Sequence, residues 1–190
     1  MLRVITCNTN GIRAAQRKGF FDWLAEQDAD VVCIQETKAQ EHQLVDPVFR
    51  PEGYHCFYND AERKGYSGTA LYAKRAPTAI ETRVGWEPVD SEGRYLRADF
   101  DGFTVISLYV PSGSSNDAAQ GRKDVFMDSF TPHMQALLEE DREFIICADW
   151  NTCHQNIDIK NWRSNQKNSG FMPYEREWLT DLYENQGWVD

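Results

Sequence analysis

The sequence predicts a single α/β domain, because short apolar runs alternate with amphipathic helical segments along its 190 residues. Apolar residues make up 41% of the chain and aromatic residues 13%, which is enough for one hydrophobic core and excludes a disordered chain. No internal repeat, linker or low-complexity tract interrupts the alternation. We therefore expect one domain over residues 1–190.

Four short runs rich in valine and isoleucine are typical of strands that are buried on both faces. These runs are Arg3–Cys7, Asp30–Ile34, Phe103–Leu108 and Glu143–Ala148. Less regular strands are expected at Tyr54–Tyr58, Thr69–Ala73, Ala79–Val84 and Tyr95–Phe100. The eight runs together indicate a sheet-based fold.

Three helices are expected, each from apolar residues that recur every three or four positions. The first covers Ile12–Gln27 and the second covers Lys123–Glu139. The third begins at Pro173 and ends near Gly187, as the preference for proline at the first turn and glycine just past the last turn predicts. The three apolar stripes are Ile12, Phe20 and Leu24; Phe126, Phe130, Met134 and Leu137; and Trp178, Leu182 and Tyr183.

The charge and the cysteines exclude several classes of protein. Thirty acidic and twenty basic side chains give a net charge of −10, which argues against a simple electrostatic binder of nucleic acid but not against an enzyme that gathers carboxylates around a metal. The five cysteines form no C-x-x-C pair, so neither a disulfide scaffold nor a structural zinc site fits. Neither a membrane span nor a signal-peptide core is present in the sequence, and a cytoplasmic protein is expected.

Polar side chains follow each of the four buried runs, at the strand ends where layered α/β proteins bind their ligands. The residues expected at one rim are Asn8, Glu36, Tyr109, Asp149 and Asn151. Because Asp149 and Asn151 are two positions apart, extended backbone would direct both side chains the same way. Oxygen donors without clustered histidine or cysteine suit Mg²⁺ or Mn²⁺ rather than zinc. The expected metal ligands are Asn8, Glu36, Asp149 and Asn151.

Such a rim is suited to hydrolysis of a phosphodiester. A metal at Glu36 would neutralise the scissile phosphate and polarise a phosphoryl oxygen. Amide and phenol groups would donate to the phosphate oxygens, at ~3 kcal/mol for each well-placed donor. Asp149 would accept a proton from the attacking water, or orient that water. The expected catalytic residues are Tyr109, Asp149 and Asn151.

Seven motifs lie in order along the chain, and together they resemble the exonuclease III family of abasic-site endonucleases. They are Asn8-Thr9-Asn10-Gly11-Ile12-Arg13, Ile34-Gln35-Glu36-Thr37-Lys38, Gly65-Tyr66-Ser67-Gly68, Leu108-Tyr109-Val110-Pro111-Ser112-Gly113, Asp149-Trp150-Asn151, Asn168-Ser169-Gly170-Phe171 and Glu175-Arg176-Glu177-Trp178. The resemblance implies a four-layer α/β sandwich of two mixed sheets flanked by helices, as in deoxyribonuclease I. It also implies Mg²⁺- or Mn²⁺-dependent cleavage of double-stranded DNA at abasic sites and 3′ ends, in DNA repair, by a monomer.

The family resemblance also implies individual roles. Glu36 looks like the metal ligand and Asp149 like the carboxylate that activates water or assists the leaving group. Asn8, Tyr109 and Asn151 look like the groups that hold and orient the phosphate. The segment 161–168 combines cations with neutral amides, which suits contact with DNA phosphates rather than with bases. The expected substrate-binding residues are Asn8, Lys38, Arg163, Asn165 and Lys167.

One departure from the family concerns the C-terminal side. Family members continue beyond the position that matches Asp190, with an Asp in an Arg-x-Asp-type strand and a terminal Ser-Asp-His, and none of the four histidines here stands in such a motif. We therefore expect the second sheet to lack its closing strands and the cleavage activity of this 190-residue chain to be impaired.

Two other functions remain open from the sequence. A regulatory nucleic-acid-binding protein resembling the catabolite repression control proteins is indicated by the segment His154–Trp162, although the retained Glu36 and Asp149 favour catalysis because a pure binder has no use for clustered carboxylates. A magnesium phosphoesterase acting on inositol or lipid phosphates is the third possibility. The match across residues 161–178 argues against it.

Overall fold

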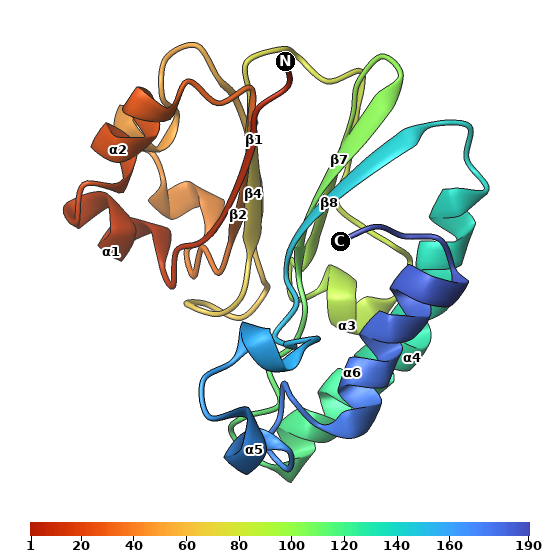
Figure 1. Cartoon of the computed structure of the whole chain (residues 1–190). Helices are drawn as coiled ribbons and strands as arrows, with labels where there is room; N and C mark the ends of the chain where they lie inside the picture. Colours follow the sequence, from red (N-terminus) through yellow and green to blue (C-terminus); the bar gives the residue numbers. More distant parts are fainter. The chain divides into compact units, whose positions relative to one another are not determined.

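The computed structural model describes all residues from 1 to 190, and the chain divides into two compact units (Figure 1). Unit 1 comprises Met1–Tyr109 and Arg142–Asp149, and unit 2 comprises Val110–Asp141 and Trp150–Asp190. The expectation of a single domain stays a prediction.

Unit 1 contains two four-stranded sheets. In the first sheet the order is β1 (Val4–Asn8), β2 (Val31–Gln35), β4 (Thr69–Ala73) and β3 (His55–Asn59). In the second sheet the order is β5 (Ala79–Glu81), β6 (Tyr95–Asp99), β7 (Phe103–Tyr109) and β8 (Glu143–Asp149). The pairs β1–β2 and β7–β8 are parallel and the remaining pairs are antiparallel, so both sheets are mixed. These sheets and their helices confirm the predicted fold class.

The two sheets share a core inside unit 1. Eight buried side chains form it, and they are Val31, Cys33, Leu71, Ala73, Leu96, Ala98, Phe100 and Val105. A polar contact lies among them, since Gln35 Nε2 donates to Ser107 Oγ over 3.2 Å and Ser107 Oγ donates to the carbonyl of Ile34. Every strand of this core was predicted to within about one residue except β5, which is only three residues long.

The first predicted helix is two helices, α1 (Ile12–Arg17) and α2 (Phe20–Gln27), so the single helix over Ile12–Gln27 is wrong. The chain breaks at Gly19, whose φ of +85° is favourable only without a Cβ atom. The break changes which residues face the sheet, so Phe21 is buried where Phe20 was expected. Both helices pack against one face of the first sheet (Figure 1).

Unit 2 is helical, with α4 (Asp117–Leu138), α5 (Trp162–Asn165) and α6 (Pro173–Thr180). α4 begins six residues earlier than expected because the Asn116 side chain caps it, accepting a hydrogen bond from the Ala119 amide over 2.9 Å. The predicted stripe of α4 is buried. The third predicted helix begins at Pro173 as expected: α6 ends at Thr180 and continues directly into a π-helical turn over Asp181–Asn185, so the helical segment stops just before Gly187 as predicted.

The two long helices of unit 2 lie side by side (Figure 1). Trp178 Nε1 on α6 donates to Thr131 Oγ1 on α4 over 2.9 Å, and the Trp178 ring meets Trp150 edge-on at 5.9 Å. Both indoles are half-buried. Shorter helical segments complete the chain: α3 (Glu87–Asp90), η1 (Glu41–Gln43), η2 (Pro47–Phe49) and η3 (Asn156–Asp158). The chain contains no helix with both the length and the apolar character needed to cross a membrane.

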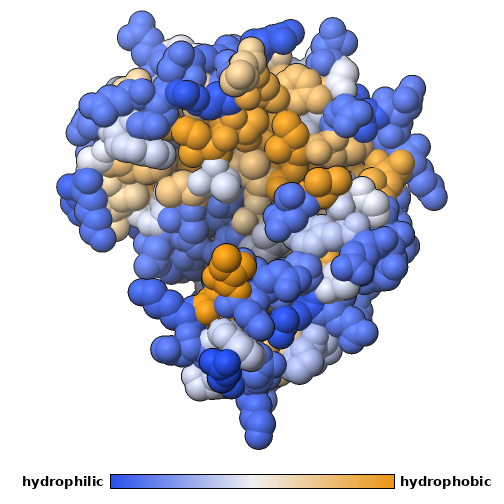
Figure 2. Space-filling model, viewed as in Figure 1, coloured by the Kyte–Doolittle hydropathy of each residue, from blue (hydrophilic) through white to orange (hydrophobic).

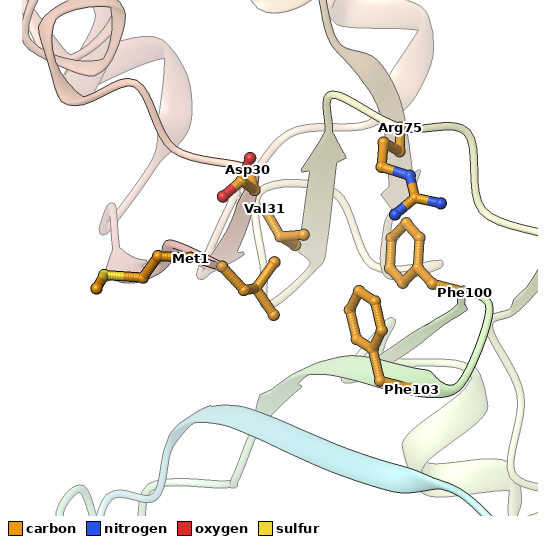
Figure 3. Close-up of a pocket in the computed structure, with 7 residues that line it drawn as sticks. Met1, Asp30, Val31, Arg75, Phe100 and Phe103 are labelled. Carbon is orange, nitrogen blue, oxygen red and sulfur yellow. The ribbon is translucent and has the colours of Figure 1, made fainter.

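An open apolar pocket of about 370 Å³ lies in unit 1, where β1 and β2 begin (Figure 3). The rings of Phe100 and Phe103 stack there at 4.9 Å, and Met1, Leu2 and Val31 complete the apolar lining. Figure 2 shows apolar side chains gathered on the face of unit 1 that includes the edge strands β1 and β8. This pocket lies at the opposite end of these strands from the polar residues described next.

Candidate active site

Four of the five predicted rim residues belong to unit 1 and lie at the same ends of their strands. In the parallel pair of the first sheet, Asn8 on β1 is in register with Gln35 on β2, directly before Glu36. In the parallel pair of the second sheet, Tyr109 on β7 is in register with Asp149 on β8. Parallel pairing places the carboxyl ends of neighbouring strands together, so each sheet contributes two of the four side chains.

Two side-chain hydrogen bonds join these residues across the sheets. The Tyr109 hydroxyl donates to Glu36 Oε1, which links β7 to the residue that follows β2. Asn8 Nδ2 donates to Asp149 Oδ2 over 2.6 Å, which links β1 to β8. The partners are 73 and 141 positions apart in sequence. The structure therefore places both carboxylates at the same strand ends, and each accepts a hydrogen bond from a group that the sequence had assigned to the phosphate.

The backbone around Glu36 is held in an uncommon conformation. Glu36 and Lys38 have φ values of +53° and +47°, in the left-handed region that costs a non-glycine residue about 1–3 kcal/mol. The amides of Thr37 and Lys38 donate to the carbonyls of Gly68 and Ser67 over 3.1 and 2.9 Å, and Gly11 donates to the Glu36 carbonyl over 2.7 Å. These bonds offset the strain and fix the direction of the Glu36 side chain.

Gly68 is needed for this support, because a Cβ atom there would lie 2.3 Å from Thr37 Oγ1. Its φ of +87° also lies in the region that favours glycine. The motif Gly65-Tyr66-Ser67-Gly68 therefore supports the Glu36 loop through main-chain hydrogen bonds. Its sequence alone did not indicate this role.

Lys38 and Asn10 lie beside the same cluster. Lys38 Nζ is 2.5 Å from Asn10 Oδ1 and 3.4 Å from Glu36 Oε1. Asn8 Oδ1 accepts a hydrogen bond from the Asn10 amide over 2.8 Å, and this turn directs Asn8 Nδ2 toward Asp149. Lys38 thus places one positive charge next to the Glu36 carboxylate.

The Tyr109 hydroxyl stays protonated over a wide pH range. Burial raises the pKa of Tyr109 above its ordinary value, the hydrogen bond to Glu36 raises it further, and the charge of Asp149 adds in the same direction. The guanidinium of Arg94 acts in the opposite direction. Tyr109 bonds Glu36 and is in register with Asp149, so both carboxylates lie near this one phenol.

Asn151 departs from the expected geometry. The extended backbone predicted between Asp149 and Asn151 is wrong, since β8 ends at Asp149 and Asn151 has a φ of +48°. In unit 2 its side-chain Nδ2 donates to the Val110 carbonyl over 2.8 Å, and this bond favours the turn over continued extension. Asparagine tolerates the left-handed region better than most residues do, which makes the turn possible.

The remaining predicted substrate-binding residues also belong to unit 2. Arg163 and Lys167 are exposed, and the Arg163 guanidinium lies 4.5 Å from the Trp162 ring centre. Asn165 is half-buried because its amide donates to the Lys160 carbonyl over 2.9 Å and its oxygen accepts from Asn168. Their role in binding stays a prediction.

Sequence reasoning missed a buried ion pair in unit 2. Lys123 Nζ lies 2.7 Å from Glu175 Oε1, and neither side chain is exposed to solvent. Lys123 also donates to the Asn151 carbonyl over 2.7 Å, while Glu175 Oε2 accepts from the amide of Gly170. The position of Lys123 three residues before Phe126, on the buried stripe of α4, was the one available indication.

The donor set of the cluster is suited to a hard divalent cation. Glu36 supplies a carboxylate that is partly exposed, and the neighbouring donors are oxygens of carboxylate, amide and hydroxyl groups. No group of three or more histidine, cysteine, aspartate or glutamate side chains is close enough to form an all-protein cage. Mg²⁺ commonly binds through one or two carboxylates, with water and substrate phosphate as its other ligands, and the residues present fit that pattern.

Comparison with known proteins agrees with this arrangement. The model of the Endonuclease/Exonuclease/phosphatase family matches residues 5–190. The chain belongs to this family. An exodeoxyribonuclease of Bacillus subtilis is 40% identical over 192 residues, covering 100% of this chain and 73% of the relative. The DNA repair nuclease APEX1 of Danio rerio is 35% identical over 185 residues, covering 96% of this chain and 59% of the relative.

A solved structure gives the same result for the fold. An AP endonuclease from Archaeoglobus fulgidus superimposes with a TM-score of 0.88 at 26% identity, covering 100% of this chain and 72% of that protein. These matches confirm the family that the motifs indicated, and the matched relatives are nucleases. The regulatory alternative is not favoured by these relatives. The chain spans between about a quarter and three quarters of the lengths of the curated relatives it matches.

Proposed function

We propose that this chain is a divalent-metal-dependent DNA phosphodiesterase of the exodeoxyribonuclease III type, which cleaves double-stranded DNA at abasic sites and trims 3′ ends. The observation that carries the proposal is the paired arrangement of Tyr109 with Glu36 and of Asn8 with Asp149. Two carboxylates, each held by a donor from another strand, are what hydrolysis of an anionic diester requires.

Glu36 is the proposed anchor of Mg²⁺ or Mn²⁺, with oxygens of Asn8, Asp149 and Asn151 as further ligands. When bound, the cation supplies charge neutralisation and polarisation of a phosphoryl oxygen. The turn that places Glu36 is fixed by main-chain bonds from two other loops, so the carboxylate is oriented before substrate arrives. Lys38, beside Glu36, is placed to meet a DNA phosphate.

Asp149 is the proposed acceptor of a proton from the attacking water. Its hydrogen bond from Asn8 fixes the direction of one of its oxygens. The Tyr109 hydroxyl keeps its proton because its pKa is raised. It donates that proton to Glu36 in the hydrogen bond seen here, and it can redirect the same donor to a phosphate oxygen as charge develops. Asn151 completes the set of catalytic residues.

DNA binding is assigned to a few local groups, since the chain as a whole carries a charge of −10. The proposed contacts are with phosphates rather than bases, through Lys38, Arg163, Asn165 and Lys167. All five cysteines are free thiols, which suits a reducing compartment, and we propose that the chain acts in the cytoplasm as a monomer.

The test is cleavage of a duplex that contains one tetrahydrofuran abasic analogue, with Mg²⁺ or with EDTA. We expect nicking that requires Mg²⁺ and that falls at least about 100-fold in Glu36→Gln. Glu26→Gln removes an exposed carboxylate from α2 and serves as the matched control. Nicking that persists in Glu36→Gln, or tight DNA binding without any Mg²⁺-dependent cleavage, would contradict the proposal.

A further inference from the structure

Arg94, directly before β6, is a buried arginine whose side chain converges on Tyr109. It is 2% exposed, and all of its described contacts lie in unit 1. Its Nη1 donates to the Tyr109 carbonyl over 3.0 Å, and its Nη2 donates to the Tyr66 hydroxyl over 3.0 Å. Its Nε pairs with a Glu92 carboxylate oxygen at 2.5 Å. The guanidinium is therefore neutralised and hydrogen-bonded in spite of its burial.

The same arginine also contacts the Tyr109 ring and its amide. The guanidinium carbon lies 4.7 Å from the centre of the Tyr109 ring, within the range of a cation–π interaction. The Tyr109 amide donates to the Arg94 carbonyl over 2.9 Å. Arg94 thus holds Tyr109 at its amide, its carbonyl and its ring face, which leaves the ring little freedom to swing away from Glu36.

Tyr66 connects this arginine to the other side of the cluster. The Tyr66 ring lies 5.7 Å from the Arg94 guanidinium, and its neighbours Ser67 and Gly68 accept the amides that fix the Glu36 loop. One guanidinium therefore contacts both Tyr109 and the loop that supports Glu36. These are the two sides of the Tyr109–Glu36 hydrogen bond.

We propose that Arg94 is a positioning residue, which fixes the Tyr109 ring and the Gly65–Gly68 loop so that the Tyr109 hydroxyl meets Glu36. Its planar guanidinium makes these contacts simultaneously, which a lysine ammonium cannot do. The catalytic consequence rests on the proposed function, whereas the structural effect on Tyr109 does not.

A double-mutant cycle tests the catalytic part. In the natural background we expect Arg94→Met to lower kcat for abasic-site cleavage by about 10- to 100-fold with KM nearly unchanged, and Arg94→Lys to recover part of the loss. In a Tyr109→Phe background, Arg94→Met should change kcat by less than about twofold, because the hydroxyl that it positions is absent. Equal losses in both backgrounds, or no loss in the natural background, would overturn the proposal.

The NMR signal of Tyr109 tests the positioning role independently of whether the chain cleaves DNA. With tyrosines labelled at ¹³Cζ, the Tyr109 signal is assigned by its disappearance in Tyr109→Phe. We expect both Arg94→Met and Arg94→Lys to shift that signal. Arg97→Met is the matched control, since Arg97 is a second buried arginine, on β6, whose Nε pairs with Asp99.

An unshifted Tyr109 signal in folded Arg94→Lys protein would overturn the positioning role even if the wild type cleaves DNA. A shifted signal in a chain that cleaves no DNA would support the positioning of Tyr109 and contradict only the proposed function. If Arg94→Met does not fold, the Tyr109 signal is compared between the wild type and the variants Arg94→Lys and Tyr66→Phe. Tyr66→Phe is a mild change, because it removes only one hydrogen bond from the guanidinium.

Discussion

The side-chain amide of Asn8 donates to the carboxylate of Asp149 over 2.6 Å and joins the edge strand of one sheet to the edge strand of the other. The hydrogen bond thus connects two residues that belong to different sheets. Asn8 is itself fixed by the Asn10 amide, so the orientation of Asp149 depends on a turn at the end of β1. The proposed general base is therefore positioned from a distant part of the sequence.

Removal of this amide should impair catalysis more than binding. We expect Asn8→Ala to lower kcat by about 100-fold, because Asp149 loses the donor that orients it and a candidate phosphate contact is lost with it. Steady-state cleavage of the abasic duplex measures the effect. Asn185→Ala, which removes an amide that bonds Asp181 in unit 2, is the control. A kcat within threefold of the wild type would refute the role of Asn8.

Tyr109→Phe should lower kcat by about 10- to 100-fold at every pH in the working range. The raised pKa keeps the hydroxyl protonated below about pH 10, so the neutral donor is present throughout and its ionisation should set no limb of the profile. The measurement is kcat against pH from about 6 to 10 for both proteins. A loss of wild-type activity near pH 8 that is absent in Tyr109→Phe would show that the pKa is not raised.

Breaking the buried ion pair between Lys123 and Glu175 should lower the free energy of unfolding. Glu175→Gln keeps the shape of the side chain but leaves the Lys123 ammonium without a counter-charge, at an expected cost of about 3–5 kcal/mol in the free energy of unfolding. Urea denaturation followed by circular dichroism gives the value. Glu177→Gln, an exposed change on the same helix, should cost little, and Lys123→Met with Glu175→Gln should recover part of the loss. Equal stability of Glu175→Gln and Glu177→Gln would contradict this account.

Asp99 should contribute to stability at neutral pH and lose that contribution in acid. Burial raises the pKa of Asp99, but hydrogen bonds from Arg97 and Thr104 and the charge of Arg142 lower it more, so the net pKa lies below its ordinary value. A depressed pKa in the folded state stabilises the protein above the unfolded pKa of about 3.9, and the contribution disappears as pH falls through the folded pKa.

The corresponding measurement is the free energy of unfolding between about pH 6 and pH 3. The wild type should lose stability toward the acid end, and Asp99→Asn should be less stable at pH 6 but have a flatter dependence on pH. Asp101→Asn, an exposed carboxylate close in sequence, is the comparison. Parallel pH curves for wild type and Asp99→Asn would disprove the linkage.

The cations of segment 161–168 should bind DNA phosphates rather than bases. Replacing Arg163 and Lys167 by alanine should weaken binding of the abasic duplex and make the plot of log affinity against log salt shallower by about one for each lost phosphate contact. Fluorescence anisotropy with the Glu36→Gln protein, in EDTA, measures binding without cleavage. Lys18 and Arg17 on the α1 side are exposed cations for the control replacement. An unchanged salt slope would exclude phosphate contacts by this segment.

The local pattern of the sequence predicts most of the elements. The runs that became β1, β2, β7 and β8 are short, branched and apolar, and all four form strands. β2 and β7 are buried as predicted, whereas β1 and β8 are only partly buried because they lie at the edges of their sheets. The stripe of α4 is likewise set by spacing alone. The helix break at Gly19 and the turn at Asn151 escaped this reasoning, because each depends on a left-handed backbone that the surrounding bonds stabilise.

By itself the sequence determined the strands, the family motifs and which polar residues follow each strand, since these depend on near neighbours and on residue type. Only the tertiary structure decided that Tyr109 meets Glu36, that Asn8 meets Asp149, and that Arg94 and Lys123 are buried with partners. The physical reason is distance along the chain. A hydrogen bond between residues 70 to 140 positions apart depends on strand order and on the packing of two sheets, which no local pattern of residues encodes.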